Sequence, residues 1–504
     1  MDLEEIENIC SDFLAVVTSA EVPGSYTQKM VKLVHPQLQI LLFSDHLGDT
    51  RFGHYGISKT QAHLRMAESC LSYLLRFTEP IHAENETLDY ECPLLQYAAR
   101  YWYTHASIGD EFCLRVPMVR LFTSKVCFPI WLSVYDPDTH DWAHFKANRP
   151  SPLYYACLLG FCDLAKALLR QGARFDVGGG KHRFPLLAAV TSGHEDVVRL
   201  LLDKGDDANR RFKNGNAAII RAASQGYSDI AQLLISHGAN PDARDKRHLT
   251  ALHWAVRQDK DDIVPILLAS GANINAKDID GRTALHYTLH FEQPNRYMFN
   301  ILIDKGVDVL GSDVFGQTML HYAVWHKDLE CVQSLIAAGA QVDKQDHRGW
   351  TALQQATSVL WAEGVYYLLS SCYAEPDLRN EQGQTALHCT ILHVIEMNDE
   401  GSENNYEDSE KKVEDSEKKV EDPGWGRIGA DIIRYLLGAS ADQSIKDEAG
   451  LTPLELARSS RSTCLGDVLK VLVSAQTQGD QPAVMHQKPQ HLDESSPIKL
   501  PTLE

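Results

Sequence analysis

The chain has 504 residues, of which 44% are hydrophobic and 23% charged, and its formal net charge is −20 at pH 7. That length is too great for one compact domain, and the composition is that of an ordinary globular protein, not of a disordered or fibrous chain. The negative charge opposes binding to nucleic acid or to an anionic membrane, for which the sequence offers no basic patch, so we expect a protein or peptide partner.

The first residues, MDLEEIENICSDFLAVV, carry acids where a signal peptide needs positive charge. No segment reaches the roughly 18 apolar residues of a membrane span. The eleven cysteines are scattered from Cys10 to Cys464 without a C-x-x-C pair or a zinc-ligand spacing. We therefore expect an intracellular, cytoplasmic protein with buried thiols and no disulfide framework, and a nuclear location is left open.

Residues 1–147 contain no repeat, and their hydrophobic pattern indicates a mixture of helix and strand. We expect a helix over Leu3–Leu14, strands over Ala15–Thr18 and Met30–Leu33 on either side of the turn EVPGSY, and a further helix from Pro36.

Two longer helices are predicted in AHLRMAESCLSYLL and PLLQYAARYWYTHA, because apolar residues recur there at i, i+3, i+4 and i+7. The second helix is unusually rich in aromatic residues. One of its faces is predicted to hold Leu95, Ala98, Tyr101 and Trp102.

From about residue 150 the sequence repeats itself with a period close to 33. Aligned on the threonine of TALHWA, equivalent positions, called anchors below, fall at 151, 184, 217, 250, 283, 318, 351, 385 and 452. Self-similarity at this period predicts stacked units that each bury an apolar face against their neighbours. A small side chain follows every anchor by five residues, as a close approach of two helices requires. These residues are Ala156, Ala189, Ala222, Ala255, Thr288, Ala323, Ala356, Thr390 and Ala457.

Each unit then carries a second apolar run at helical spacing that ends in glycine, such as VVRLLLDKG and IVPILLASG. The units are joined by segments such as AKDIDG, GSDVFG, KQDHRG and RNEQGQ, in which Asp or Asn precedes Gly by three residues and predicts a turn. The pattern is therefore helix, turn, helix and hairpin link.

The last anchor spacing, 67, contains one repeat and an insertion at 397–426 in which EDSEKKV occurs twice in tandem. Its eleven acids and four lysines cannot support a core, so we expect a disordered, solvated excursion between the two helices of one repeat. An acidic docking tag and a neutral repeat expansion in a tolerant loop are both open interpretations.

The repeated residues resemble the ankyrin repeat closely, with TALH at Thr250, Thr283 and Thr385, TMLH at Thr318, and GANINAKDIDG from Gly271. The resemblance implies a mainly α fold, an ankyrin-repeat solenoid of about nine helix-turn-helix units with β-hairpin links, preceded by a small α+β winged-helix-like and helical domain. It also implies that the histidine of each motif hydrogen-bonds backbone between units. The units at 151 and 217 depart from the motif, so we expect them to be looser or to act as caps.

The order ICSDFLAVV, MVKLVHPQLQILL, AESCLSYLL and PLLQYAARYWYTHA resembles the segment between the ATPase and the sensor repeats of fungal NACHT proteins of the NOD-like receptor type. The resemblance implies the closing half of a winged helix and a helical coupling element. The phosphate-binding motif G-x-x-x-x-G-K-[ST] is not present, since in GGGKH His182 follows Lys181 and Phe175 stands at the first glycine. We expect no ATPase activity and no cofactor; the alternative is a fragment of a NACHT receptor whose catalytic half is missing.

These patterns and resemblances divide the chain into five parts. The predicted parts are a partial winged-helix and helical coupling domain at 1–147, ankyrin repeats at 148–396, the insertion at 397–426, the last repeats at 427–474, and a disordered tail at 475–504.

Two histidine patterns suggest metal sites but are interpreted otherwise. HDWAH places His140 and His144 one helical turn apart, as in zinc hydrolases, yet its flanks YDPDT and NRP favour a loop. The histidines of the repeats recur one unit apart, too far to share an ion; they are His253, His286, His321 and His388. We therefore expect no catalytic residue and no metal ligand, with a zinc hydrolase at His140 and His144 as the remote alternative.

A binding surface is the function that remains. In ankyrin arrays, partners are usually held on the concave side by the hairpin tips and by the ends of the first helices. On this chain the tips include Lys246, Ile279, Asp280, Val314 and His347. We predict that the partner contacts Arg247, Arg257, Phe291, Phe315, Trp325, His326, Arg348 and Trp350. Phe315 and Trp325 are placed at the centre, because aromatic and arginine side chains are the usual interface anchors. The opposing interpretation is that some of these rings pack between repeats.

Overall fold

The computed structural model describes residues 14–17, 30–33, 59–78, 94–138, 150–289, 294–403, 425–460 and 465–478, with the backbone alone for the two strands, for Lys59, for 398–403 and for Gln478. The expected helices at Leu3–Leu14 and from Pro36, and most of the tail, lie outside these residues. The chain divides into two compact units. One comprises Met1–Ala222 with Asp229–Ala239, and the other comprises Ala223–Ser228 with Asn240–Glu504.

The first unit begins with a pair of short strands. β1 (Leu14–Val17) and β2 (Met30–Leu33) run antiparallel, with Leu14 opposite Leu33 and Val17 opposite Met30. The two predicted strands are therefore confirmed, and β1 begins and ends one residue earlier than the pattern indicated.

Four helices follow: α3 (Lys59–Leu75), α5 (Leu95–Ile108), α6 (Glu111–Thr123) and α7 (Cys127–Val134). The sequence predicted α3 and α5 but not the other two. α6 contains Pro117, which normally interrupts a helix, and α7 is a short apolar run without helical alternation. Asp110 begins α6 by accepting a hydrogen bond from the N–H of Phe112 at 3.0 Å.

The aromatic helix α5 buries Leu95, Ala98, Ala99, Trp102 and Ala106, which stand at i, i+3, i+4, i+7 and i+11 and so share one face of a helix. The prediction that Tyr101 shares this face is wrong, because its side chain is 40% exposed. Six residues separate it from Leu95, and at 3.6 residues per turn that offset points the ring away from the buried face.

Trp102 is fully buried at the centre of a cluster of rings that joins the helical segment to the first repeat. Its ring lies 5.3 Å from that of Trp131 in α7, 6.0 Å from Phe122 in α6 and 5.6 Å from Phe161 beside the first repeat's second helix. Trp131 in turn donates its indole N–H to the carbonyl of Ala99 at 2.9 Å. Trp102 therefore connects the helical segment to the first repeat through its stacked ring pair with Phe161, while its edge-to-face pairs with Trp131 and Phe122 hold the ring within its own segment.

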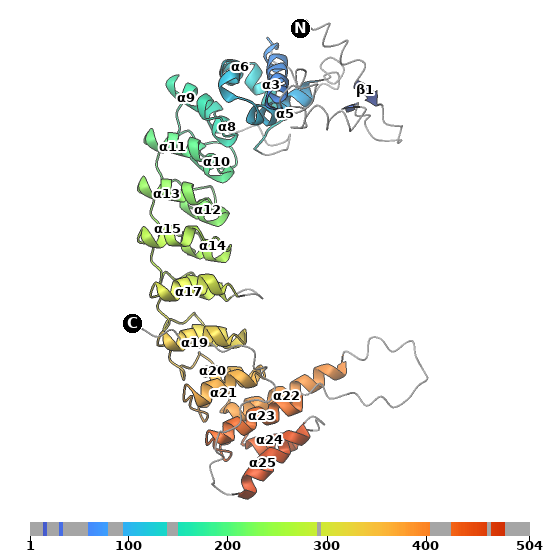
Figure 1. Ribbon diagram of the computed structural model, residues 1–504, viewed down its shortest axis with the longest axis vertical. Coiled ribbons are helices and arrows are strands. Elements are labelled where there is room, and N and C mark those ends of the chain that lie inside the picture. The colour runs from blue at the N-terminus through green and yellow to red at the C-terminus, as the bar shows by residue number, and fades with distance from the viewer. Residues whose placement is uncertain are drawn as a thin grey trace, which may run out of the picture. The chain divides into compact units, whose positions relative to one another are not determined.

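Nine pairs of helices follow in chain order within the described residues (Figure 1), in agreement with the predicted number of units. The pairs are α8 (Pro152–Leu158) and α9 (Cys162–Arg170), α10 (Pro185–Ser192) and α11 (Glu195–Asp203), α12 (Ala218–Gln225) and α13 (Ser228–Ser236), α14 (Ala251–Arg257) and α15 (Ile263–Ala269), α16 (Ala284–Thr288) and α17 (Arg296–Asp304), α18 (Met319–Trp325) and α19 (Leu329–Ala337), α20 (Ala352–Ser358) and α21 (Ala362–Ser370), α22 (Ala386–Glu403) and α23 (Trp425–Gly438), and α24 (Pro453–Ser459) and α25 (Gly466–Gln478). The first helix of each pair is called the inner helix below and the second the outer helix.

The small residue five positions after each anchor lies in every inner helix and is at most 1% exposed, from Ala156 to Ala457. At this position the inner helix is packed on all sides, so that a larger side chain would overfill the core. The prediction of close helix-to-helix contact is confirmed.

The hairpin links are tight turns, not strands. The described links contain isolated bridges, such as Ser312 with Thr318, and no strand. In each of the four sequence-predicted turns the glycine has a positive φ, as the turn requires; these are Gly281, Gly316, Gly349 and Gly383. The link before Thr250 has His248 at this position, also with a positive φ, of 62°.

Consecutive hairpins of the second unit are joined by one backbone hydrogen bond each. The N–H of the residue after the turn aspartate or its equivalent donates to a carbonyl of the preceding hairpin at 2.9 to 3.0 Å. The bonds run from Ile279 to Arg247, Val314 to Asp280, His347 to Phe315, Glu381 to Arg348, and Glu448 to Gln382. This series fixes the register of each tip against the next.

The eighth pair contains the predicted insertion. α22 extends to Glu403 and α23 begins at Trp425, so the backbone is helical at both ends of 397–426. Residues 404–424, with both copies of EDSEKKV, lie outside the described residues.

The hairpin glycines give a test of how closely the repeats approach each other. Gly316 and Gly306 have nearly the same φ, +78° and +76°, so alanine suffers similar backbone strain at both, about 1–2 kcal/mol. A Cβ on Gly316 would stand 2.7 Å from the amide nitrogen of His347 in the next hairpin, whereas a Cβ on Gly306 meets no atom within 4 Å. We expect Gly316→Ala to lower the free energy of unfolding by roughly 2 kcal/mol more than Gly306→Ala, measured by urea denaturation. Equal losses would mean that the hairpins are not packed as described.

Candidate functional site

Each repeat with a TALH or TMLH motif begins its inner helix with a threonine and histidine that cap one another. Thr250 donates its backbone N–H to Nδ1 of His253 at 3.2 Å, and its hydroxyl lies 2.9 Å from the same nitrogen. Because Nδ1 accepts from an amide, the ring hydrogen is assigned to Nε2, which donates to the carbonyl of Arg282 in the next link at 3.2 Å. The ring therefore ties its own helix to the following repeat.

The same bridge recurs down the second unit. Nε2 of His321 lies 3.0 Å from the carbonyl of Trp350, and Nε2 of His388 lies 3.1 Å from that of Leu451. Where the sequence has Gln354 instead, the side-chain oxygen accepts the N–H of Thr351 and the amide nitrogen donates to the carbonyl of Gln384 at 2.9 Å. The predicted structural role of the repeated histidine is confirmed in these units.

His286 is the exception. Its Nδ1 caps Thr283 in the usual way, but its Nε2 is buried without a hydrogen-bond partner. This repeat has the shortest of the described inner helices, five residues in α16, and its anchor is followed by the next at 35 residues instead of 33. The bridge to the following repeat is therefore missing at one position in the second unit.

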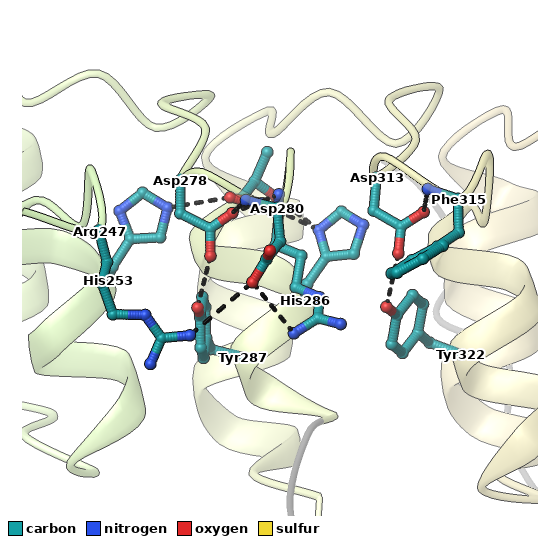
Figure 2. A network of polar contacts seen from close by, with 11 residues as sticks. Arg247, His253, Asp278, Asp280, His286, Tyr287, Asp313, Phe315 and Tyr322 are labelled. Carbon is teal, nitrogen blue, oxygen red and sulfur yellow. Dashed lines mark hydrogen bonds and ion pairs between the residues drawn. The ribbon is translucent and has the colours of Figure 1, made fainter.

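A second set of contacts ties each inner helix to its own hairpin (Figure 2). An aromatic side chain nine residues after the turn aspartate donates to its carboxylate. Tyr287 donates to Asp278 at 2.5 Å and Tyr322 to Asp313 at 2.8 Å, as Figure 2 shows, and Trp254 donates to Asp245 at 3.0 Å in the preceding repeat. The other carboxylate oxygen accepts two backbone N–H groups of the turn, as Asp313 does from Phe315 and Gln317, both at 2.9 Å. Burial and then the hydrogen bond that Tyr322 donates to Asp313 raise the pKa of Tyr322 to about 12, so the phenol keeps its proton and remains a donor.

These bonds use the polar groups of the turn and leave the side chain two positions after the aspartate facing solvent. In four consecutive hairpins this residue is Arg247, Asp280, Phe315 and Arg348. Phe315 is 58% exposed, and Trp325, at the end of the inner helix of the same repeat, is 61% exposed. Neither of these two rings packs between repeats.

The other predicted contact residues differ in exposure. Arg247 and Arg348 are exposed, whereas Arg257, His326 and Trp350 are half-buried, and Phe291 lies outside the described residues. Arg257 lies over the indole of Trp254, with 5.3 Å between its guanidinium carbon and the ring centroid. Burial lowers the pKa of His326 below its usual value, so it is mostly neutral at pH 7. Trp350 is held from both sides, since its N–H donates to Asp346 and its carbonyl accepts from His321.

Sequence reasoning did not identify Arg282 as part of this surface. Asp280 lies between Arg247 and Arg282, with oxygen-to-nitrogen distances of 3.8 and 3.9 Å. Figure 2 shows Arg247 directed at Asp280. The position directly before the anchor varies in type between repeats, and only the structure shows that the side chain of Arg282 reaches the tip of its own hairpin, where Arg247 of the preceding hairpin meets the same carboxylate.

No metal site is found among the residues that the structure describes, where no three His, Cys, Asp or Glu side chains are grouped to hold an ion. His140 and His144 lie outside them. Within the same residues, no helix combines the length and apolar character that a membrane crossing needs.

Helix pairs whose hairpin links are hydrogen-bonded to one another define a repeat protein. Side chains at equivalent positions of successive repeats lie in a row on its surface. The chain belongs to the ankyrin repeat family: the family model for ankyrin repeats, three copies in length, matches residues 126–212, 204–278, 252–346 and 320–398. Together these matches run from 126 to 398, more than half of the 504 residues. The last helix pair, α24 and α25, lies beyond the matched range and continues the pattern.

Three proteins illustrate the range of relatives. A protein of Monascus ruber, azaphilone pigments biosynthesis cluster protein L, is 30% identical over 224 residues, which cover 40% of this chain and 46% of that protein. An ankyrin repeat and KH domain-containing protein of Caenorhabditis briggsae is 41% identical over 68 residues, 13% of this chain and 3% of its own. The Drosophila melanogaster ankyrin repeat and KH domain-containing protein mask is 36% identical over 78 residues, 15% of this chain and 2% of its own. The chain thus spans less than half the length of each.

Ankyrin repeats indicate a module for protein–protein interaction, and the family is generally non-catalytic. The contacts described above agree with that use, since hydrogen bonds within and between repeats occupy the polar groups that recur in each turn and each inner helix. The residues that differ between repeats are those at the tips and helix ends.

The buried histidines predict how stability depends on pH. Burial lowers the pKa of His253, His321 and His388 below the usual 6.5, and that of His286 to about 4. The unfolded chain therefore binds protons that the folded chain does not, and stability present above pH 6.5 is lost as the pH falls toward 4. We expect the urea midpoint to fall between pH 7 and pH 5, with His286 alone accounting for about 2 kcal/mol of that loss.

A substitution that copies Gln354 separates this effect from the titration of carboxylates. His321→Gln keeps an acceptor for Thr318 and a donor for the Trp350 carbonyl but does not titrate near neutral pH. We expect it to unfold at nearly the same urea concentration as wild type at pH 7 and to lose less stability by pH 5. An unchanged pH dependence in this variant would show that His321 is not buried in its neutral form.

Proposed function

We propose that this protein is a non-catalytic interaction module that binds a protein or peptide across the hairpin tips and inner-helix ends of the repeats between residues 240 and 385. The single observation that carries the proposal is the exposure of Phe315 and Trp325, two large rings of one repeat, at 58% and 61%. Exposed aromatic side chains held on a fixed backbone are the usual centres of protein interfaces. The concave-face residues predicted from the sequence are therefore kept as the proposed site.

The rigidity of the tips supports the same function. The backbone beside Phe315 is bonded in three directions: its N–H donates to Asp313, its carbonyl accepts from His347, and the N–H of Val314 donates to Asp280. A partner that binds these tips does not have to order a loose loop, which lowers the entropic cost of association.

Residues 1–147 are proposed to act as a coupling segment of the kind that separates a NACHT ATPase from ankyrin repeats. The antiparallel pair β1 and β2 stands where that resemblance expects the wing, and Trp102 of α5 packs on the first repeat, which supports the proposal. An experimental structure of the full chain that includes residues 1–58 tests it. A wing packed on a helical bundle supports the relationship, and any other fold removes it.

The binding site can be tested by removing the two rings. We expect Phe315→Ala and Trp325→Ala each to weaken partner binding about thirtyfold, equivalent to ~2 kcal/mol, without changing the urea midpoint, because neither side chain is buried. Tyr297→Ala is the matched control, since this ring on outer helix α17 is 62% exposed. The measurement is the set of proteins captured from a lysate by each variant and quantified against wild type.

Two results would contradict the proposed site. A lowered urea midpoint with an unchanged set of partners would mean that the rings stabilise the repeats. A loss of partners in Tyr297→Ala equal to that in Trp325→Ala would mean that exposed aromatic residues contribute without regard to position.

A further inference from the structure

The chemistry of this surface changes along the repeats in a fixed order. At the hairpin tips Arg247, Asp280, Phe315 and Arg348 occupy equivalent positions in consecutive repeats. At the inner-helix ends, Arg257 is two repeats before Trp325. A cationic end, formed by Arg247 and Arg257, therefore precedes an aromatic centre, formed by Phe315 and Trp325, and a single arginine follows.

The cations of this surface are poorly paired within the protein. No ion pair involves Lys246, Arg257 or Arg348 among the described residues, and Arg247 reaches Asp280 only at 3.8 Å, where it competes with Arg282. Elsewhere arginines have close partners, such as Arg296 with Asp328 at 3.0 Å and Arg174 with Asp176 at 2.6 Å. In a chain with 68 acidic and only 48 basic residues, cations without a close acidic partner on the same surface as exposed rings favour an acidic partner.

The spacing of the repeats sets the spacing of the partner's side chains. Each hairpin is two chains wide and is bonded directly to the next, so that one repeat advances by about 10 Å, twice the separation of neighbouring strands. The cationic end is two repeats from the aromatic centre, about 20 Å, and Arg348 is one repeat, about 10 Å, on the other side. An extended peptide advances about 3.3 Å per residue, so these intervals correspond to about six and three residues.

We infer that the partner presents an extended acidic segment in which one large apolar residue lies between two acidic residues, about six positions from one and three from the other. This inference rests on the proposed binding surface and adds the chemistry of its ligand. The apolar residue contacts Phe315 and Trp325, one acid contacts Arg247 and Arg257, and the other contacts Arg348. A peptide fits better than a nucleic acid because Asp280 lies between the cations and the rings, and because the net charge of −20 repels a continuous polyanion.

Arg257 is the most informative residue of the cationic end. Its guanidinium is held over the ring of Trp254, whose indole N–H is itself bonded to Asp245, so the charge is positioned before any partner arrives. A positioned, partly desolvated cation contributes more to binding than a mobile surface charge.

The experiment measures fluorescence anisotropy of labelled synthetic peptides with the full chain. The probe is a 12-residue peptide of glycine and serine with one tryptophan and two glutamates at the stated spacings, prepared in both chain directions. We expect one direction to bind at least tenfold more tightly than its glutamine analogue and than a peptide with both glutamates beside the tryptophan. Its affinity is also expected to fall with added salt, because the contacts are ionic.

Charge reversal provides the second arm. Arg257→Glu is expected to bind the glutamate peptide at least tenfold more weakly than wild type does, and to bind a lysine analogue of that peptide more tightly than wild type does. Lys305→Glu makes the same change in net charge on an exposed residue at the end of outer helix α17, and should alter neither affinity. Urea denaturation of both variants verifies that they are folded.

The outcomes separate this inference from the proposed surface. Peptides selected from an unbiased display library that need Trp325 but carry no acidic residue would overturn the acidic chemistry and leave the surface standing. Glutamate peptides that bind Phe315→Ala and Trp325→Ala as well as wild type would overturn the surface itself. No saturation below millimolar peptide, or tighter binding of a 12-residue oligothymidine than of the glutamate peptide, would overturn the inference.

Discussion

The second unit depends on a buried side chain at the first turn of the inner helices α14, α18, α20 and α22, because this side chain is satisfied by the following repeat. Nδ1 of His253 is used by Thr250, so its Nε2–H needs an acceptor that its own repeat does not offer, and the carbonyl of Arg282 supplies it. An unpaired polar group in such a site costs about 1–3 kcal/mol, so the repeats stabilise one another pairwise. Gln354 shows that the requirement is geometric, since an amide meets it as an imidazole does.

The sequence could predict the contacts that every repeat makes, and it could not predict those that are made only once. The anchors, the small residue after them and the turn glycines recur at a fixed period, because each is demanded by a contact that every repeat makes. Tyr101 was misplaced on the buried face of α5 because it was grouped with its neighbour Trp102, although an offset of six residues from Leu95 directs it elsewhere. The contact of Trp102 with Phe161, 59 positions away, is one that no local pattern predicts. α6 was missed since Pro117 contradicts a helix by propensity, while Glu111 at its start accepts the N–H of Leu164 in the first repeat.

The candidate surface was predictable in position and not in detail. Hairpin tips face solvent in any such turn, so the exposure of Phe315 follows from its place two residues after Asp313. The half-burial of Trp350 does not follow from its own repeat, because its carbonyl is used by His321 of the preceding one. Since backbone and carboxylate bonds determine the turn, the tip side chain is free to be arginine, aspartate or phenylalanine, and specificity can change without changing the fold.

The unpaired Nε2 of His286 has a mechanical consequence. A stack resists tension only as well as its weakest junction. The junction after α16 keeps the hairpin bond from Val314 to Asp280 but lacks the histidine bridge, and α16 is the shortest of the described inner helices. If the second unit is pulled along the direction in which its repeats succeed one another, rupture should begin between His286 and Thr318. The part of the stack that carries Arg247 and Arg257 would then separate from the part that carries Phe315 and Trp325. A ligand bound to both parts would oppose that separation.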